Sequence, residues 1–303
     1  MIKRALRLMI ALMGVASSLT AQAPRSAQPS AQTFENSPTV QHDVAYSRAG
    51  EHPLLLDVYQ PGEISTDLHA AVILIHGGGW ISFDKSTMSG MGNFLARSGL
   101  VAFAVDYRLM QGKENLWPAQ LDDVQRAVRW IRANASKYHV DPDHIGAFGH
   151  SAGAQLAALL GMEDTRDNSD PALAKYSSKV QAVVDVSGPT DFTTNHDADG
   201  DAFLTVFFGG DYAHNAAAWR DASPVFHVAK GDAPVLILHG THDDSVPLAQ
   251  AQELADKLKE AKVPVKLITV DDVHTFEKPE NRRRVAYESG AFYNEYLRAG
   301  RSR

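Results

Sequence analysis

Short runs of apolar residues alternate with longer amphipathic stretches from about residue 40 to the end of the chain. Two early segments, residues 40–46 and 54–59, alternate in polarity, which is typical of an antiparallel edge. Six later segments are short, β-branched or apolar, and are bounded by Gly, Pro, Asp or His, which predicts buried strands. These segments are residues 71–75, 101–105, 145–148, 182–186, 235–238 and 265–270.

Amphipathic helices with a 3.6-residue period are predicted between these strands. Two apolar stripes should face the sheet, and they consist of Leu121, Val124, Val128 and Ile131, and of Leu248, Ala251, Leu254, Ala255 and Leu258. Pro118 and Pro247 stand at the starts of these helices, where a missing N–H costs nothing. A last helix is expected at about residues 280–297. The alternation predicts one α/β domain, residues 40–303, with about eight mostly parallel strands and helices on both faces.

Residues 188–230 show little periodicity and contain many Asp, Thr, Asn and Gly residues between two predicted strands. Two interpretations fit this pattern equally well. The segment forms either loops and short helices over the functional end of the sheet, or a plain connection with one helix.

Residues 1–23 have the pattern of a secretory signal peptide, with a basic start, a short apolar run and small residues before Ala23. Residues 24–39 are rich in Ala, Gln, Ser and Pro and are predicted to be a linker. The apolar run is short for a membrane span, so we expect a secreted or periplasmic protein without a span after cleavage.

Composition and charge narrow the range of partners. The 303 residues are 44% hydrophobic and 21% charged, which is ordinary for a globular protein. The formal charge is −7, and the predicted leader carries basic but no acidic residues, which argues against nucleic acid or an anionic membrane as partner. The basic run 282–284 is expected to be a solvated helix face. There is no cysteine, which excludes disulfides and a lipoprotein anchor.

The segment Gly149-His150-Ser151-Ala152-Gly153 fits the GxSxG nucleophile elbow, and it stands between a predicted strand and an Ala/Leu-rich helix as that motif requires. The glycines allow a tight turn that exposes Ser151 at a helix N-terminus. Residues 76–80, His-Gly-Gly-Gly-Trp, directly follow the strand at 71–75. Their unobstructed glycine amides suit a developing oxyanion, and the amide of Ala152 is the expected partner donor.

A catalytic serine also needs a histidine base and an orienting carboxylate, in the chain order Ser, Asp, His. Asp243 and Asp244 both follow the strand at 235–238, and the residues alone leave the choice between them open. His274 is the only histidine after the last predicted strand and is the expected base. All these groups follow parallel strands, at the edge where open α/β sheets place their sites.

Two arrangements resemble metal sites, and we interpret neither as one. His239 and His242 stand beside Asp243 and Asp244, but one of these carboxylates already has a role and no complete ligand set has metal-site spacing. The acidic run 197–201 resembles the start of a calcium loop but lacks its glycine and its last carboxylate. We therefore expect neither a metal ion nor another cofactor.

With these motifs, the chain resembles the hormone-sensitive-lipase-like and feruloyl-esterase-like branch of the α/β-hydrolases through most of residues 50–298. Besides HGGGW and GHSAG, the resemblance rests on residues 105–109, 118–124, 140–145 and 221–225. It implies an α/β-hydrolase fold and a serine esterase of class EC 3.1.1. In the family's GTxDxxVP pattern the catalytic acid corresponds to Asp243, and the oxyanion donors after the histidine correspond to Gly77 and Gly78.

The expected reaction is hydrolysis of short-chain or aryl carboxylic esters through an acyl-enzyme on Ser151. Export and the family suggest small-molecule or polysaccharide-linked substrates, such as acetyl or feruloyl esters of plant polysaccharide. Three alternatives share these residues or this fold: a prolyl-oligopeptidase-type peptidase, an arylformamidase, and a binding domain that has lost catalysis. The sequence does not indicate an oligomeric state.

Overall fold

The computed structural model describes residues 37–62, 68–194 and 198–297. The predicted signal peptide and nearly all of the predicted linker lie outside the described residues, so both stay predictions. The acidic run 197–201 begins outside them and continues into a helix from Ala198. None of the described helices is both long enough and apolar enough to cross a membrane.

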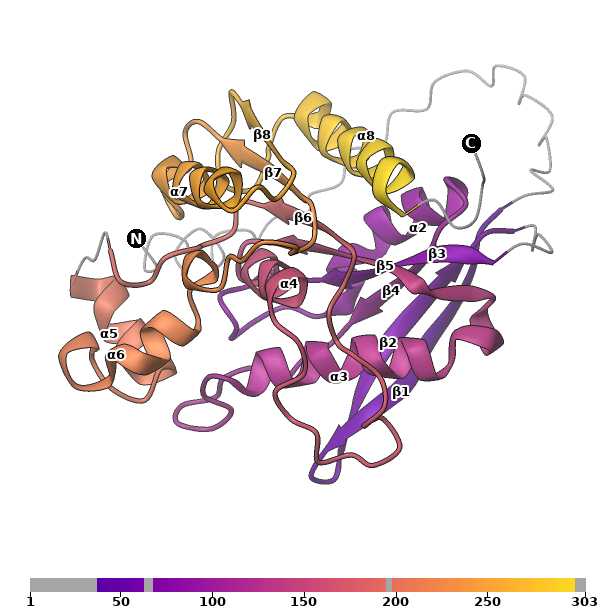
Figure 1. Cartoon of the computed structure of the whole chain (residues 1–303), viewed down its shortest axis with the longest axis horizontal. Helices are drawn as coiled ribbons and strands as arrows, with labels where there is room; N and C mark the ends of the chain where they lie inside the picture. Colours follow the sequence, from indigo (N-terminus) through magenta and orange to yellow (C-terminus); the bar gives the residue numbers. More distant parts are fainter. Residues whose placement is uncertain (1–36, 63–67, 195–197, 298–303) are drawn as a thin grey trace, which may run out of the picture.

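Eight strands form one sheet in the order β1-β2-β4-β3-β5-β6-β7-β8 (Figure 1). The pairs β1–β2 and β2–β4 are antiparallel, and all other neighbouring pairs are parallel. The strands are β1 (Thr39–Ala49), β2 (His52–Gln60), β3 (His69–Ile75), β4 (Val101–Val105), β5 (Val140–His150), β6 (Ala182–Val186), β7 (Val235–Gly240) and β8 (Val265–Val270). The predicted mainly parallel α/β sheet with an antiparallel edge is therefore confirmed.

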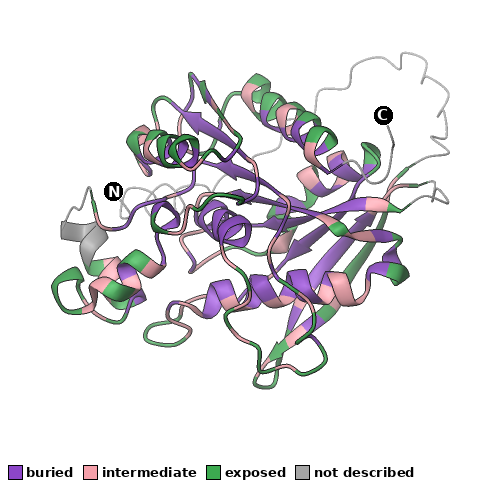
Figure 2. Cartoon of the chain, viewed as in Figure 1, coloured by how far each residue is buried: buried purple, intermediate pink, exposed green. Residues whose placement is uncertain are grey.

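Helices cover both faces of the sheet, which is purple with buried residues in Figure 2. The described α-helices are α2 (Ser89–Arg97), α3 (Ala119–Ala133), α4 (Ala152–Met162), α5 (Ala198–Phe207), α6 (Tyr212–Asp221), α7 (Leu248–Glu260) and α8 (Pro279–Tyr296). The structure also has three 3₁₀ turns within the described residues: η1 (Lys85–Met88) before α2, η2 (Ala135–Tyr138) after α3 and η3 (Pro224–Phe226) after α6. Helices α3, α4 and α7 share one hydrophobic core, and α2 and α8 pack on the opposite face.

The apolar stripes predicted for α3 and α7 are the faces that these helices bury. Helix α4 differs, because all eleven of its residues are buried. It therefore has no exposed polar face, and Gln155 is its only polar side chain. Arg282, Arg283 and Arg284 lie on an exposed face of α8, as expected.

The segment 188–230 adopts the first of the two predicted arrangements, with α5, α6 and η3 within it. Figure 1 places α5 and α6 together at one end of the molecule. Phe203 and Phe207 of α5 stack on Trp80, which belongs to the loop after β3. Helix α5 therefore covers the loop in which the sequence predicts oxyanion donors.

Candidate active site

Ser151 occupies the sharp turn between β5 and α4. Its backbone adopts φ 56° and ψ −122°, a region that non-glycine residues rarely visit and that often marks functional turns. A Cβ atom on Gly149 would stand 2.1 Å from the carbonyl oxygen of Gly153. A Cβ atom on Gly153 would stand 2.2 Å from the carbonyl oxygen of Ile75. Both glycines are thus required by close backbone approach, as predicted for a nucleophile elbow.

His274 connects Ser151 to Asp243, although these residues come from three separate loops after β5, β7 and β8. Its Nε2 atom lies 2.8 Å from Ser151 Oγ, and its Nδ1 atom lies 2.7 Å from Asp243 Oδ2. A carboxylate accepts only, so Nδ1 carries hydrogen and Nε2 is free to accept the serine proton. This is the geometry of a nucleophile, a general base and an orienting acid.

Of the two carboxylates that the residues left open, Asp243 is the one that faces His274. Its side chain is fully buried, and its Oδ1 atom accepts the backbone N–H groups of Ser245 and Val246. Burial opposes ionisation, but hydrogen bonds from His239 and His274 outweigh it and hold the pKa of Asp243 well below its usual value. Asp244 is exposed on the surface.

The glycine loop after β3 lies directly against Ser151. A Cβ atom on Gly77 would stand 3.3 Å from Ser151 Cβ and 2.8 Å from the carbonyl oxygen of His150. The hydroxyl of Tyr107 donates a hydrogen bond to the carbonyl of His76, and the two rings stack. These two contacts hold the start of the loop in place. Within the described part of the chain, no hydrogen bond uses the amides of Gly77, Gly78 or Ala152. These three N–H groups are available to an oxygen bound beside Ser151.

Because Gly77 lies so close to Ser151, a side chain at position 77 should disturb catalysis. In Gly77→Ala the new methyl group displaces the loop from Ser151, so we expect kcat for an activated ester to fall by about 10²- to 10³-fold with little change in KM. Gly90→Ala in α2 is the control, because a Cβ atom there has no neighbour within 4 Å and the backbone of Gly90 is not left-handed. A kcat for Gly77→Ala equal to that of the control would contradict an oxyanion role for this loop.

His150, the second residue of the elbow, is a part of the site that the sequence did not single out. Its Nε2 atom lies 3.1 Å from the carbonyl oxygen of His274 and donates to it. Burial, reinforced by the charge of His274, lowers the pKa of His150 to about 4. A histidine inside the GxSxG motif carries no sequence signal for this contact, because its partner is a backbone atom 124 residues away.

This lowered pKa makes folding stability depend on pH. Unfolded His150 has a pKa of about 6.5, so between roughly pH 6.5 and 4 the unfolded chain binds a proton that the folded chain does not. The stability contributed by neutral His150 is present above this window and is lost as the pH falls through it. Glutamine keeps a hydrogen-bond donor but cannot titrate. We therefore expect the free energy of unfolding of His150→Gln, measured by chemical denaturation, to fall less between pH 7 and pH 5 than that of the parent protein. Equal losses in both proteins would show that His150 titrates normally.

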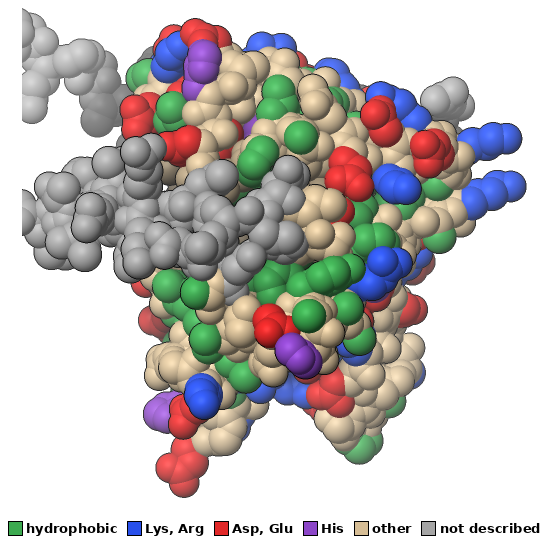
Figure 3. All heavy atoms as spheres, turned by 90° about the vertical axis from the view of Figure 1, so that its left-hand side faces the viewer, with side chains coloured by type: hydrophobic (Ala, Val, Ile, Leu, Met, Phe, Trp, Pro, Cys, Tyr) green, Lys and Arg blue, Asp and Glu red, His purple; other side chains and the backbone are tan. Residues whose placement is uncertain are grey.

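Aromatic side chains form a wall beside the glycine loop. Trp80 stacks on Phe207 at 4.8 Å between ring centroids and meets Phe192 edge-on at 5.8 Å. Gln155 of α4 accepts the Trp80 indole N–H and donates to the carbonyl of Ala222, so it links the loop to the α5–α6 segment. Figure 3 looks onto the side of the molecule that carries α5 and α6, where hydrophobic side chains gather near the centre of the face.

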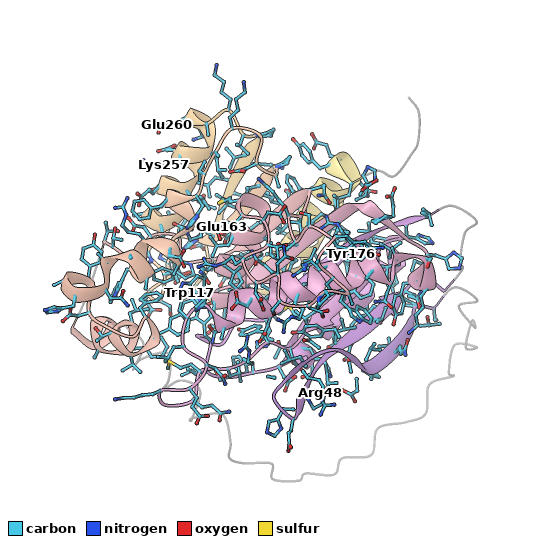
Figure 4. All side chains as sticks on the ribbon, turned by 60° about the horizontal axis from the view of Figure 1, so that its bottom comes forward. Arg48, Trp117, Glu163, Tyr176, Lys257 and Glu260 are labelled. Atoms are coloured by element: carbon cyan, nitrogen blue, oxygen red, sulfur yellow. The ribbon has the colours of Figure 1, made fainter. Side chains whose placement is uncertain are left out.

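One group of metal-ligand type occurs within the described ranges: Glu163, Asp221 and His227, whose ligand atoms lie within 4.8 Å of one another. Arg166 already binds Asp221 at 2.8 Å, and the indole of Trp117 donates to the same carboxylate. Trp117 and Glu163 are labelled in Figure 4. The guanidinium of Arg166 supplies the positive charge that a metal ion would bring. We therefore interpret the three residues as part of an ion-pair network that anchors α6.

Three comparisons relate the chain to known proteins. A family model described as BD-FAE matches residues 56–258. The probable carboxylic ester hydrolase LipM of Mycobacterium tuberculosis is 31% identical over 230 residues, which are 74% of this chain and 53% of the relative. The chain thus spans about half the length of the curated relatives that it matches.

Solved structures of similar fold match over nearly their whole length. A truncated carbohydrate esterase from gut microbiota is 27% identical, with a TM-score of 0.73, and the match covers 87% of this chain and 98% of that one. Esterase 2 of Thermogutta terrifontis, phosphonylated by sarin, is 25% identical with a TM-score of 0.73, covering 85% and 94%. These neighbours share the α/β-hydrolase fold that the sequence predicted.

Proposed function

The chain belongs to the BD-FAE family of α/β-hydrolases, and we propose from this premise that it is a carboxylic ester hydrolase acting through Ser151. The observation that carries the proposal is the continuous contact from Ser151 Oγ through His274 to Asp243, at 2.8 and 2.7 Å. The esterase names of the relatives and structural neighbours support the same class of reaction.

In the proposed reaction, Nε2 of His274 takes the hydroxyl proton of Ser151 as Oγ attacks the ester carbonyl carbon. The negative charge that develops on the carbonyl oxygen is held by the amides of Gly77, Gly78 and Ala152. His274 then returns the proton to the departing alcohol, which leaves an acyl group on Ser151. Water, deprotonated by His274, then attacks the acyl carbon; His274 passes this proton to Ser151 Oγ as the acyl–Oγ bond breaks and the acid leaves.

Asp243 has two roles in this scheme, and its surroundings suit both. Because Oδ2 accepts from Nδ1 of His274, the imidazole keeps the tautomer in which Nε2 receives a proton. Its ionised state, favoured by four surrounding donors, stabilises the imidazolium that forms at each step.

The experiment that tests the proposal uses a fluorophosphonate probe, which forms a covalent bond only with an activated serine. We expect stoichiometric labelling, with the modified peptide mapping to Ser151. An unlabelled, correctly folded protein would instead support a binding domain that has lost catalysis.

We propose short-chain or aryl esters as substrates, including acetyl or feruloyl esters carried by plant polysaccharide. The similarity to a carbohydrate esterase supports the esters carried by polysaccharide. A series of p-nitrophenyl esters of increasing acyl length, assayed beside acetylated xylan and methyl ferulate, measures this preference. Turnover of matched amides or formamides above that of esters would favour the peptidase or arylformamidase alternatives, because a leaving amine demands stronger protonation.

We also propose that the protein is secreted or periplasmic, on the strength of the basic and apolar pattern of residues 1–23. Mass spectrometry of the protein from a secreting host measures its mature N-terminus. A chain that stays in the cytoplasm and begins at residue 1 would contradict the proposal.

A further inference from the structure

His239 lies beside the carboxylate that faces His274. It belongs to β7, and its side chain is fully buried. Its Nε2 atom lies 2.9 Å from the carbonyl oxygen of Val246 and 3.2 Å from Asp243 Oδ2. Both neighbours are oxygen acceptors, so Nε2 carries hydrogen; it donates to the Val246 carbonyl and lies within ion-pair distance of Asp243 Oδ2.

Asp243 receives a different pair of donors on each oxygen. The Oδ1 atom accepts two backbone amides from its own turn, whereas Oδ2 faces Nδ1 of His274 and Nε2 of His239. Within the described residues, His239 is the one basic side chain other than His274 whose nitrogen lies within 4 Å of this carboxylate. Since Val246 ends the turn that begins at Asp243, one imidazole contacts the carboxylate and also the backbone that holds it.

We infer that His239 is a positioning residue, whose Nε2–H keeps Asp243 Oδ2 in line with Nδ1 of His274. The inference rests on the proposed function, because it assigns His239 an effect only through the triad acid. A reacting group displaced by about 1 Å can lose on the order of 10²-fold in rate, so a donor that restrains the acid has a measurable effect on kcat.

The electrostatic surroundings keep His239 a donor to Asp243. Asp185 is fully buried on the neighbouring strand β6, where burial raises its pKa. Burial alone would lower the pKa of His239, but its contacts with Asp243 and Val246 and the charge of Asp185 outweigh burial and raise it. Protonation changes only Nδ1, which has no partner in the described structure. The Nε2–H therefore donates in either charge state.

Two replacements of similar size separate positioning from simple packing. His239→Gln can place an amide N–H near the position of Nε2, whereas His239→Leu fills the space without a donor. We expect His239→Leu to lower kcat for a p-nitrophenyl ester about 10- to 100-fold with KM within about twofold, and Gln to recover most of the loss. His239→Asn, whose amide is too short to reach Oδ2, replaces the Leu variant if that variant does not fold.

A double-mutant cycle then tests the route of the effect. In an Asp243→Asn background, removing the His239 donor should lower kcat by less than about threefold, because the group on which it acts is already altered. Equal losses in both backgrounds, or a Gln variant no better than Leu, would overturn the inference. Ser151→Ala, assayed in parallel, separates the two proposals. Full activity of Ser151→Ala would overturn the proposed function itself. An inactive Ser151→Ala together with a fully active His239→Leu would overturn only the inference about His239.

Discussion

Ser151→Ala should abolish nearly all esterase turnover, with a fall in kcat of about 10⁶-fold on an activated short-chain ester. The alanine leaves no hydroxyl for His274 to deprotonate, so no acyl-enzyme forms. The glycine-loop amides and substrate binding still operate, so a residual acceleration of roughly 10³- to 10⁴-fold over water is expected. Initial rates with p-nitrophenyl acetate measure the loss.

The fold of this variant should be unchanged, because the strained turn at residue 151 is enforced by the close approaches at Gly149 and Gly153 rather than by the serine hydroxyl. Circular dichroism and the denaturation midpoint provide the control. Activity within tenfold of the parent protein, in a variant that folds normally, would show that Ser151 is not the nucleophile.

Asp243→Asn should lower kcat by about 10⁴-fold, because the asparagine amide donates to Nδ1 of His274 and so reverses its tautomer. Nε2 then carries hydrogen and cannot accept the proton of Ser151. Asp244→Asn is the matched control, because it makes the same change on the exposed neighbouring carboxylate. We expect that variant to stay within about twofold of the parent kcat. Single-turnover kinetics should show the Asp243 effect in both acylation and deacylation, because His274 acts as base in each.

A reversed outcome, with Asp244→Asn inactive and Asp243→Asn active, would mean that the loop after β7 rearranges when substrate binds. Comparable small effects of both variants would remove the acid from the mechanism altogether. In either case the distances found around His274 would not describe the reacting enzyme.

Local patterns in the sequence determined most of the architecture. The eight strands, the two sheet-facing helix stripes and the turn between β5 and α4 all follow from periodicity and glycine placement, because these features depend on residues close together in the chain. Strand β5 is longer than predicted, since residues 140–144, with polar positions and Pro142 among them, do not look like a buried strand. The motifs also predicted Ser151 and His274 as partners, and these two side chains meet at 2.8 Å.

Only the tertiary structure decided those contacts that no local motif encodes. The residues left Asp243 and Asp244 open, and the difference between them is the direction in which each points from the same loop. His150 and His239 gave no signal, because each contacts the site through a partner on another loop or strand. The arrangement of residues 188–230 was open for the same reason: α5 is held by stacking on Trp80, more than a hundred residues away. Contacts between distant parts of the chain leave no local pattern, so they appear only when the chain has folded.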